Sequence, residues 1–350
     1  MRIRKRKIVN FGSPYIIAEI GSNHNGDMAL AKKMIDAAAR CGVDCVKFQS
    51  FDNKSLISES EYQRNQTYDD GDGGKKHFGS LRDMVDKYYL RREQHFELRE
   101  YCLEKGVEFC STPFSKEEVD LLVECDVPFF KVASMDINNI ELLAYMAQKK
   151  RPIIISTGMA DLNEIAKAID VVKENGAIDI SLLHCISIYP PESKDINLRN
   201  ITMLQNTFNL PVGFSDHSIG TTIPLASVAL GACVIEKHFT IDKNLPGWDH
   251  AISADVQELE TIVTQTKAVN EGLGSYTRVV SEAELNKRDK FRRSLVYSRN
   301  LQVGHRISES DLESKRPGTG IKPVDRDIVL GRVLTKNVEC DKIVNITDFQ

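Results

Sequence analysis

Residues 211–238 read PVGFSDHSIGTTIPLASVALGACVIEKH, with a short apolar strand candidate at each end, Pro211–Ser215 and Val234–His238. Near-continuous apolar runs of this kind are typical of parallel strands buried on both faces. Segments with helical periodicity separate such runs elsewhere, for example residues 29–38 and 162–172. Six further strand candidates precede the quoted stretch: Tyr15–Gly21, Cys45–Ser50, Val107–Thr112, Phe129–Ser134, Pro152–Thr157 and Ile180–Cys185.

Eight alternating strand and helix units over about 270 residues predict an α/β fold, the (β/α)₈ TIM barrel. The main alternative is an open doubly wound sheet. Such a sheet collects its ligand-binding residues near the point where its strand order reverses. Because polar residues follow all eight strand candidates in this sequence, the barrel is favoured.

The composition is that of an ordinary globular protein, with 41% of the 350 residues hydrophobic and 27% charged. The net charge of −4 gives no general attraction to nucleic acid or anionic membranes. Residues 2–7 are basic but lack the apolar run of a signal peptide, so we interpret them as a solvated terminus. No apolar stretch reaches the length of a membrane span. The eight cysteines fit no metal or disulfide spacing, which predicts buried reduced thiols and a cytoplasmic protein.

We expect the barrel to occupy residues 1–275, followed by a linker over 276–292 and a compact β module over 293–350. Two similar pieces of the module, residues 304–312 and 341–349, suggest an internal duplication. Within the barrel, the polar connection over residues 52–90 contains the acidic, glycine-rich segment Asp69–Gly74. We interpret this connection as a mobile loop over the barrel mouth, and the alternative is a disordered insertion without function.

Polar side chains are concentrated where the predicted strands end. Catalytic residues of TIM barrels lie at these positions. Charges inside apolar strands cost free energy unless they are paired or bound to a ligand, so their concentration at one end of a barrel predicts an active site. The candidates are Glu19, Lys47, Gln49, Thr112, Lys131, Ser134, Asp136, Ser156, Ser187, Tyr189, Ser215, His217 and His238.

His217 and His238 fall at equivalent points of neighbouring strands. Either histidine alone is more typical of a buried core residue, but together they predict a two-imidazole metal site with open positions for water and substrate. The ligand type does not choose among manganese, magnesium, cobalt and zinc. Asp216 and Glu236 are candidates for groups that hold the histidines, or less plausibly for direct ligands.

Lys47 and Lys131, with nearby hydroxyl groups, predict a cradle for a small phosphorylated carboxylate. One functional alternative is a lysine that forms a Schiff base, as in aldolases of the same fold. A purely structural alternative pairs Lys131 with Glu19 or Asp136. Glu19 is the carboxylate best placed to face a developing cation or to accept a proton.

These residues lie in motifs that resemble the sialic acid synthase family, and the resemblance covers nearly the whole chain in order. The C-terminal module resembles the antifreeze-like (SAF) domain that these synthases carry. The motifs that carry the resemblance are residues 18–26 (AEIGSNHNG), 46–49 (VKFQ), 111–115 (STPFS), 130–134 (FKVAS), 156–159 (STGM), 183–185 (LHC), 189–190 (YP), 215–217 (SDH), 236–240 (EKHFT), 246–250 (PGWDH) and 315–320 (KRPGTG).

The resemblance implies that phosphoenolpyruvate condenses with an open-chain N-acetylated hexosamine and water, giving a nine-carbon keto acid and phosphate. A divalent cation at His217 and His238, manganese first and magnesium or cobalt as alternatives, is implied to polarise the sugar aldehyde. It further implies a domain-swapped homodimer in which Arg316 contacts the acylamino group in the partner's barrel. Implied phosphoenolpyruvate ligands are Lys47, Lys131, Thr112, Ser134 and Ser156, and implied sugar ligands are Gln49, Tyr189, Asp249 and Arg316.

Three positions depart from the sialic acid pattern. Ser187 stands where asparagine is expected, Asp136 replaces glutamate, and Trp248 occupies a position that is usually proline. All three are on the side implied for the sugar, and unmatched polar groups reject substrates strongly. We therefore expect an acceptor of either the N-acetylmannosamine type or the diacetamido-trideoxyhexose type used by legionaminate and pseudaminate synthases. A Schiff-base aldolase using Lys131 and a binding protein with a relict barrel are more distant alternatives.

Overall fold

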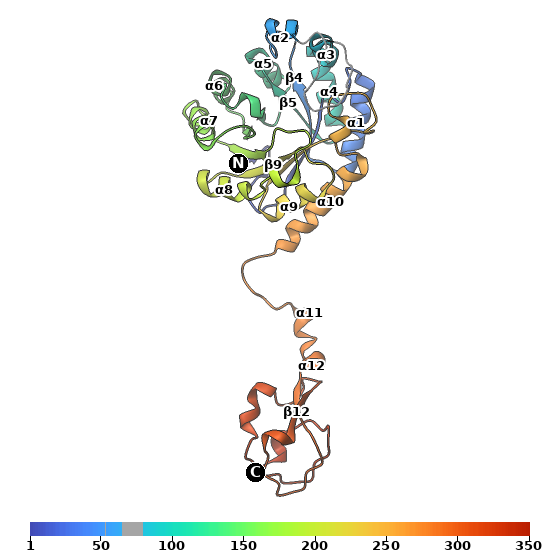
Figure 1. Cartoon of the computed structure of the whole chain (residues 1–350), viewed down its shortest axis with the longest axis vertical. Helices are drawn as coiled ribbons and strands as arrows, with labels where there is room; N and C mark the ends of the chain where they lie inside the picture. Colours follow the sequence, from blue (N-terminus) through green and yellow to red (C-terminus); the bar gives the residue numbers. More distant parts are fainter. Residues whose placement is uncertain (53, 65–79) are drawn as a thin grey trace. The chain divides into compact units, whose positions relative to one another are not determined.

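The computed structural model describes residues 1–52, 54–64 and 80–350 of the chain. These residues form two compact units, Met1–Gly274 and Ser275–Gln350 (Figure 1). The segment Asp69–Gly74, which we expected to move over the barrel mouth, lies outside the described residues.

The first unit is built on one sheet of eight strands, in the order β5-β4-β3-β10-β9-β8-β7-β6. Each paired neighbour in this order is parallel, and the end strands β5 and β6 contact each other, so that the sheet is nearly closed. The predicted barrel is confirmed. Its strands are β3 (Tyr15–Gly21), β4 (Cys45–Ser50), β5 (Glu108–Pro113), β6 (Phe130–Val132), β7 (Ile153–Ser156), β8 (Ile180–Cys185), β9 (Val212–Asp216) and β10 (Val234–His238).

Helices surround these strands, as Figure 1 shows. Their inward faces and the outward faces of the strands form one large apolar core. The helices of the first unit are α1 (Met28–Cys41), α2 (Glu59–Arg64), α3 (Leu81–Tyr88), α4 (Arg92–Glu104), α5 (Lys116–Glu124), α6 (Ile140–Gln148), α7 (Leu162–Glu174), α8 (Arg199–Phe208), α9 (Thr222–Ala229) and α10 (Val256–Leu273).

Helix α1 illustrates how the local sequence sets an element. The side chain of Asp27 accepts hydrogen bonds from the backbone N–H groups of Ala29 and Leu30, which satisfies donors that have no partner within the helix. Gly42 ends the helix with a φ of +81°, a conformation that glycine adopts without steric cost. Residues spaced by three and four positions between these caps, such as Met34 and Ala38, are buried against the barrel.

The basic N-terminus is a hairpin, not the solvated segment that we expected. Strands β1 (Arg2–Ile3) and β2 (Arg6–Lys7) pair in antiparallel register. Ile3 and Ile8 are buried and pack with side chains from the first residues of the barrel strands. The arginines remain near the surface, where they pair with acidic groups. The hairpin therefore closes the amino end of the barrel.

Strand β6 is shorter than the predicted Phe129–Ser134. The chain turns after Ala133 into a 3-10 helix over Ser134–Asp136, in which the N–H of Asp136 donates to the carbonyl of Ala133 at 3.0 Å. The parallel ladder ends at Val132 as a result. This early turn brings Ser134 to the carboxyl end of the barrel on a turn and not on a strand.

The described parts of the 52–90 connection contain two helices, α2 and α3. Helix α3 begins with a reciprocal capping box between Ser80 and Asp83. Buried residues of these helices join Phe51 in a small core of its own, which includes Tyr62, Met84, Val85 and Tyr88. This small core adds a wall to one side of the barrel mouth.

The second unit has its own apolar core around Leu295, Tyr297 and Val344. Two pieces of it have the same local structure, in agreement with the suggested duplication. In each piece a polar residue caps a 3-10 helix with a reciprocal box, Ser308 with Asp311 in one and Asn345 with Asp348 in the other. Its other elements are α11 (Glu282–Leu285), α12 (Arg288–Phe291), β11 (Ser294–Tyr297), β12 (Leu312–Lys315) and a 3-10 segment (Pro323–Ile328).

Seven of the eight cysteines are buried, as predicted, and all eight are free thiols. Cys340 is the exception, because it lies exposed on the second unit, outside any apolar strand. Within the described part of the chain, no helix has both the length and the apolarity needed to cross a membrane.

Candidate active site

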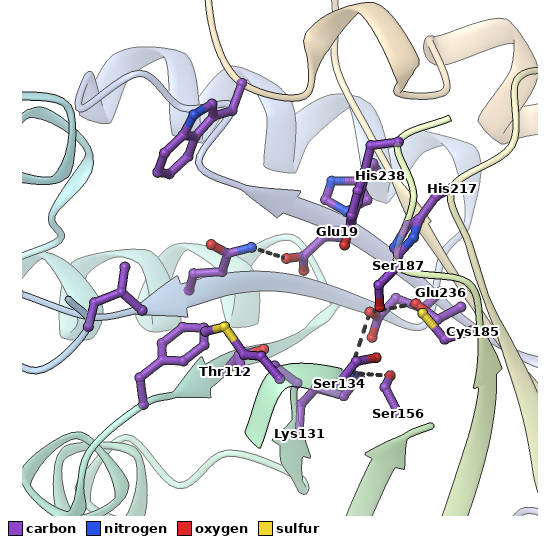
Figure 2. Close-up of a pocket in the computed structure, with 18 of the residues that line it drawn as sticks. Glu19, Thr112, Lys131, Ser134, Ser156, Cys185, Ser187, His217, Glu236 and His238 are labelled. Carbon is purple, nitrogen blue, oxygen red and sulfur yellow. Dashed lines mark hydrogen bonds and ion pairs between the residues drawn. The ribbon is translucent and has the colours of Figure 1, made fainter. Parts of the chain in front are cut away.

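A cavity of about 690 Å³ opens at the carboxyl ends of the barrel strands. Figure 2 shows polar side chains that converge on it from β3, β5, β6, β7, β8, β9 and β10 and from the turns that follow them. Most of the residues predicted from the strand ends line it together: Glu19, Lys47, Gln49, Thr112, Lys131, Ser134, Ser156, Ser187, Tyr189, Ser215, His217 and His238.

Two buried lysines form the floor of the cavity. Lys47 Nζ lies 2.7 Å from Glu19 Oε2 and donates to Thr112 Oγ1 at 3.0 Å. Lys131 Nζ donates to Ser156 Oγ at 2.7 Å and to the carbonyl of its neighbour Val132. Both ammonium groups are therefore fixed by hydroxyl groups that also line the cavity.

Glu236 lies between the two lysines. Its Oε1 atom is 3.7 Å from Lys47 Nζ and 3.8 Å from Lys131 Nζ. The structural alternative that paired Lys131 with Glu19 or Asp136 is thus wrong, since Glu236 is the closer carboxylate. The period of two along β10 places Glu236 and His238 on the inner face together, and this was the signal for its position.

The two carboxylates of the floor differ in their affinity for protons. Burial raises the pKa of Glu19 to about 7, although Lys47 opposes the shift. Burial acts in the same direction on Glu236, but Lys131 and Lys47 outweigh it and lower the pKa of Glu236. Glu236 is therefore the anion that balances the lysines, and Glu19 is the group that can exchange a proton near neutral pH.

The lysines are affected in turn. Burial lowers the pKa of Lys131, although the charge of Glu236 opposes this shift. Burial alone would lower the pKa of Lys47 as well, but Glu19 and Glu236 reverse the effect and raise it. Lys47 is consequently a permanent cation of the floor, with two carboxylates at hand.

The predicted histidine pair lies at the rim above this floor. The ring centroids of His217 and His238 are 5.4 Å apart. His217 Nδ1 lies 2.8 Å from the carbonyl oxygen of Ile186, and His238 Nδ1 lies 3.6 Å from Asp249 Oδ2. Tyr189 stacks on His217 at a centroid distance of 4.0 Å. His217 is thus held by a hydrogen bond and by stacking on Tyr189, and both imidazole rings line the cavity.

Both imidazoles are in the form that binds metals. Burial lowers the pKa of His217 to about 4 and that of His238 to about 3, so that both are neutral near pH 7. No group of three or more His, Cys, Asp or Glu side chains in the described part of the chain is arranged to hold an ion. Two neutral imidazoles are a donor set that suits a divalent cation with further ligands from water or substrate.

Asp216 lies in a buried ion pair next to His217 in the chain. Its Oδ2 atom lies 2.7 Å from Lys237 Nζ, and both side chains are almost fully buried. Lys237 also donates to the carbonyl of Ser218, and the N–H of Ser218 donates to Asp216 Oδ1 at 2.8 Å. This ion pair fixes the turn that carries His217, behind the cavity and not in it.

Three of the predicted residues do not line the cavity. Asp136 turns away and accepts a hydrogen bond from Asn139 Nδ2 at 3.3 Å. Asp249 contacts His238, as described above, and Arg316 belongs to the second unit, where its guanidinium lies over the ring of Phe291 at 5.2 Å.

Several lining residues could not be found at the strand ends, because they come from connections or are apolar. Met135 and Met159 lie among the polar residues. Cys185 lies there too; it is the last residue of β8, and the sequence indicated it only as a buried thiol. Gly158 is close enough to the hydroxyls of Ser134 and Ser187 that any side chain there would clash with both. The other side of the cavity is lined by Leu56, Ile57, Leu81, Phe114 and Trp248.

Known proteins resemble this chain over nearly its full length. N,N'-diacetyllegionaminic acid synthase from Campylobacter jejuni is 42% identical over 94% of this chain and 98% of that protein. Pseudaminic acid synthase from the same species is 34% identical over 96% of both chains. The solved N-acetylneuraminic acid synthetase of Leptospira borgpetersenii superposes with a TM-score of 0.73 and 34% identity, over 82% of this chain and 94% of that one.

Two family profiles match consecutive parts of the chain. The SAF domain matches residues 292–350, which lie within the second unit. The NeuB family matches residues 34–278, which is more than half of the chain and contains most of the barrel. With these profiles, the relatives and the polar cavity in agreement, the chain belongs to the NeuB family of nonulosonic acid synthases and carries a C-terminal SAF domain.

Proposed function

We propose that the barrel condenses phosphoenolpyruvate with the open-chain aldehyde of an N-acetylated amino sugar and water. The products are a 2-keto-3-deoxy acid and inorganic phosphate. One observation carries this proposal: a floor of two buried lysines and a pair of neutral histidines line the same cavity. The floor suits an anion and the pair suits an aldehyde oxygen, so that the two reactants can meet.

The floor suits phosphoenolpyruvate because its cations are already desolvated. Lys47 and Lys131, with Thr112, Ser134 and Ser156, supply charge-assisted hydrogen bonds to a phosphate and a carboxylate. Glu236 balances part of the lysine charge before the anion arrives. Together with Glu19, which lies 2.7 Å from Lys47, it keeps the two buried lysines from being uncompensated cations when no anion is bound.

Glu19 is proposed to face carbon two of phosphoenolpyruvate. As carbon three forms the new bond to the aldehyde carbon, positive charge develops at carbon two, and a carboxylate beside it stabilises that charge. Water then adds at carbon two, and phosphate leaves as the keto group forms. The raised pKa of Glu19 suits it to accept the proton of that water near neutral pH.

His217 and His238 are proposed to hold a divalent cation, with manganese as the first candidate and magnesium or cobalt as alternatives. The chemistry supplied by such a cation, when it is bound, is Lewis acidity toward the aldehyde oxygen of the sugar. The hydrogen bond between His217 Nδ1 and the carbonyl of Ile186 orients that ring for this role, and Asp249 lies 3.6 Å from His238 Nδ1.

The acceptor is proposed to be a diacetamido-trideoxyhexose, with N-acetylmannosamine as the alternative. Support comes from the higher identity to the relative named N,N'-diacetyllegionaminic acid synthase, 42%, than to the solved N-acetylneuraminic acid synthetase, 34%. Ser187 and Trp248, two of the positions that depart from the sialic acid synthase pattern, both line the cavity. The side chain of Ser187 is shorter than the expected asparagine, so that it reaches less far toward a bound sugar. Gln49, Tyr189 and, from a partner subunit, Arg316 are the other proposed sugar contacts.

Product analysis tests this function. The purified chain is incubated with phosphoenolpyruvate, manganese and each sugar in turn, and the acid formed is identified by mass spectrometry. We expect a product whose mass equals phosphoenolpyruvate plus sugar plus water minus phosphate, formed fastest from the diacetamido sugar. A faster reaction with N-acetylmannosamine would overturn the choice of sugar, and absence of any such product would overturn the condensation.

One observation favours a second function. Lys131 is buried and its pKa is lowered, as in lysines that form Schiff bases. A Schiff-base aldolase would be trapped on Lys131 by borohydride in the presence of substrate and would keep its activity in a chelator. We expect neither result, because Lys131 is held by Ser156 and lies beside Glu236.

A further inference from the structure

The cavity has two chemically different sides. Its polar side carries the floor and the histidine pair. Its other side, here called the apolar wall, consists of Leu56, Ile57, Leu81, Phe114 and Trp248. These five residues come from four separate parts of the chain, namely the connection after β4, helix α3, the turn after β5 and the loop after β10.

Packing behind the apolar wall holds it in place. All five residues belong to or pack against the small core around Phe51, Met84 and Tyr88. The rings of Trp248 and Tyr88 have centroids 5.7 Å apart, and those of Phe114 and Phe51 have centroids 6.2 Å apart. The wall is therefore formed in the absence of a ligand and needs no rearrangement to present its surface.

The wall offers little to a sugar hydroxyl. Four of its five side chains, all but that of Trp248, carry no hydrogen-bonding group, and the carboxylate of Glu61, which also lines the cavity, lies 3.8 Å from the guanidinium of Arg64. A hydroxyl group that is buried against aliphatic side chains loses its water without gaining a hydrogen bond. A methyl group in the same place gains about fourfold in binding by leaving water.

We infer that the apolar wall binds the end of the acceptor remote from its aldehyde, and that it selects a terminal methyl group over a terminal hydroxymethyl group. This inference rests on the proposed function, because the floor must take phosphoenolpyruvate and the histidine pair must take the aldehyde. The remaining part of an open-chain sugar then faces the wall. Leu56, Ile57 and Trp248 become specificity-determining residues of the reaction.

A pair of acceptors that differ in one group tests the inference. One is the diacetamido-trideoxyhexose, and the other is the same sugar with a hydroxymethyl group in place of its terminal methyl. We expect kcat/KM of the wild type to favour the methyl-bearing sugar by about 10–100-fold, the range for one small group in an apolar pocket. Leu56→Asn, which keeps the side-chain size, is expected to reduce this preference about tenfold. Ile57→Thr serves as a second variant and should act in the same direction.

Met159→Asn is the matched control. Met159 also lines the cavity but is not part of the wall, and its φ of +64° is one that asparagine tolerates. We expect this variant to change kcat/KM for both acceptors by the same factor, so that the ratio of the two kcat/KM values stays as in the wild type. The KM for phosphoenolpyruvate should also stay within about twofold in the two wall variants, because the floor is unchanged.

The outcomes separate the inference from the function on which it rests. Equal kcat/KM for the two sugars, or an unchanged ratio in both wall variants, would overturn the wall as a selector while condensation stands. A ratio that falls as much in Met159→Asn as in Leu56→Asn would do the same. No phosphate release from phosphoenolpyruvate with either sugar would overturn both the proposed function and this inference.

Discussion

Among the single residues of the cavity, Glu236 has the largest part in balancing the charge of the two buried lysines. It lies between two buried lysines and keeps its charge, while Glu19 takes up protons more readily. Breaking a buried ion pair leaves an uncompensated charge, and this is costly in a site from which water is largely excluded.

We therefore expect Glu236→Gln to lower the free energy of unfolding of the first unit by about 3 kcal/mol. Urea unfolding followed by the fluorescence of Trp248, the one tryptophan of the chain, measures the change. Glu260→Gln on the exposed face of α10 is the control and should change it by less than about 0.5 kcal/mol. Equal effects of the two substitutions would mean that Glu236 does not neutralise the lysines.

Much of the polar side could be predicted from the sequence, because side chains alternate along a strand and the carboxyl ends of barrel strands meet. That rule brought Glu19, Lys47, Lys131 and the histidine pair together. It could not pair the charges: which carboxylate neutralises Lys131 depends on distances of a few ångströms across β6 and β10, and not on either strand alone.

Among the elements, the N-terminal hairpin is a charged segment that nevertheless contributes buried apolar residues to the barrel. Ile3 and Ile8 close the barrel at the end opposite to the cavity, while the arginines around them stay near the surface. The strand candidates were found because they are continuous apolar runs. The hairpin and the turn at Ser134 were missed because two-residue strands and single turns carry too few residues for a period.

Ile8→Ala is expected to destabilise the first unit by about 3 kcal/mol, because a buried isoleucine leaves a cavity when it is truncated. Val9→Ala, at a position that is 39% exposed, is the neighbouring control and should cost less than about 1 kcal/mol. The urea midpoint checks both. The KM for phosphoenolpyruvate should be unchanged, and a rise in KM with Ile8→Ala would show that the hairpin also shapes the site.

In the second unit, Asp311 closes the capping box of the 3-10 helix over Glu309–Asp311. It is fully buried, and its carboxylate contacts Arg299, His305 and Ser308. Burial raises the pKa of Asp311, but the hydrogen bonds from His305 and Ser308 outweigh it and hold this pKa well below its usual range. The pKa of an aspartate in the unfolded chain is about 3.9. Because the pKa of Asp311 is lower in the folded chain, the ionised carboxylate stabilises the fold at pH values above about 3.9, and this stabilisation is lost as the pH falls below that value.

Asp311→Asn should therefore lower the melting temperature of the second unit at pH 7, in line with a loss of about 2 kcal/mol. The difference from the wild type should shrink as the pH falls from 4 toward 2, because the carboxyl group of the unfolded wild type then binds a proton that the folded chain excludes. Calorimetry of the full chain at several pH values measures both effects. A difference that stays constant down to pH 2 would contradict a charged role for Asp311.

At the scale of the whole molecule, the chain is two units, and Arg316 belongs to the second. The sequence could predict both units, because each carries its own pattern of apolar residues and turns. Contacts between subunits leave no apolar period in the local sequence, so a role of the second unit in another subunit's site could not be predicted from such patterns. Arg316 is proposed to act on the cavity of a partner subunit.

Complementation tests that proposal. His217→Ala and Arg316→Ala are each expected to be nearly inactive, and their subunits are mixed under conditions that allow exchange. If Arg316 acts in trans, one site of each mixed dimer is intact, so that about a quarter of the wild-type activity returns. If Arg316 acts within its own chain, no activity returns on mixing.

We propose that phosphoenolpyruvate and a sugar aldehyde react over the lysine floor beside the histidine pair. Phosphate release from phosphoenolpyruvate, followed with and without the diacetamido sugar, tests it most directly. We expect release only when the sugar and manganese are both present, one phosphate for each sugar consumed, and a loss of at least about 100-fold in His217→Ala. Phosphate release that proceeds without the sugar, or that survives in His217→Ala, would contradict it.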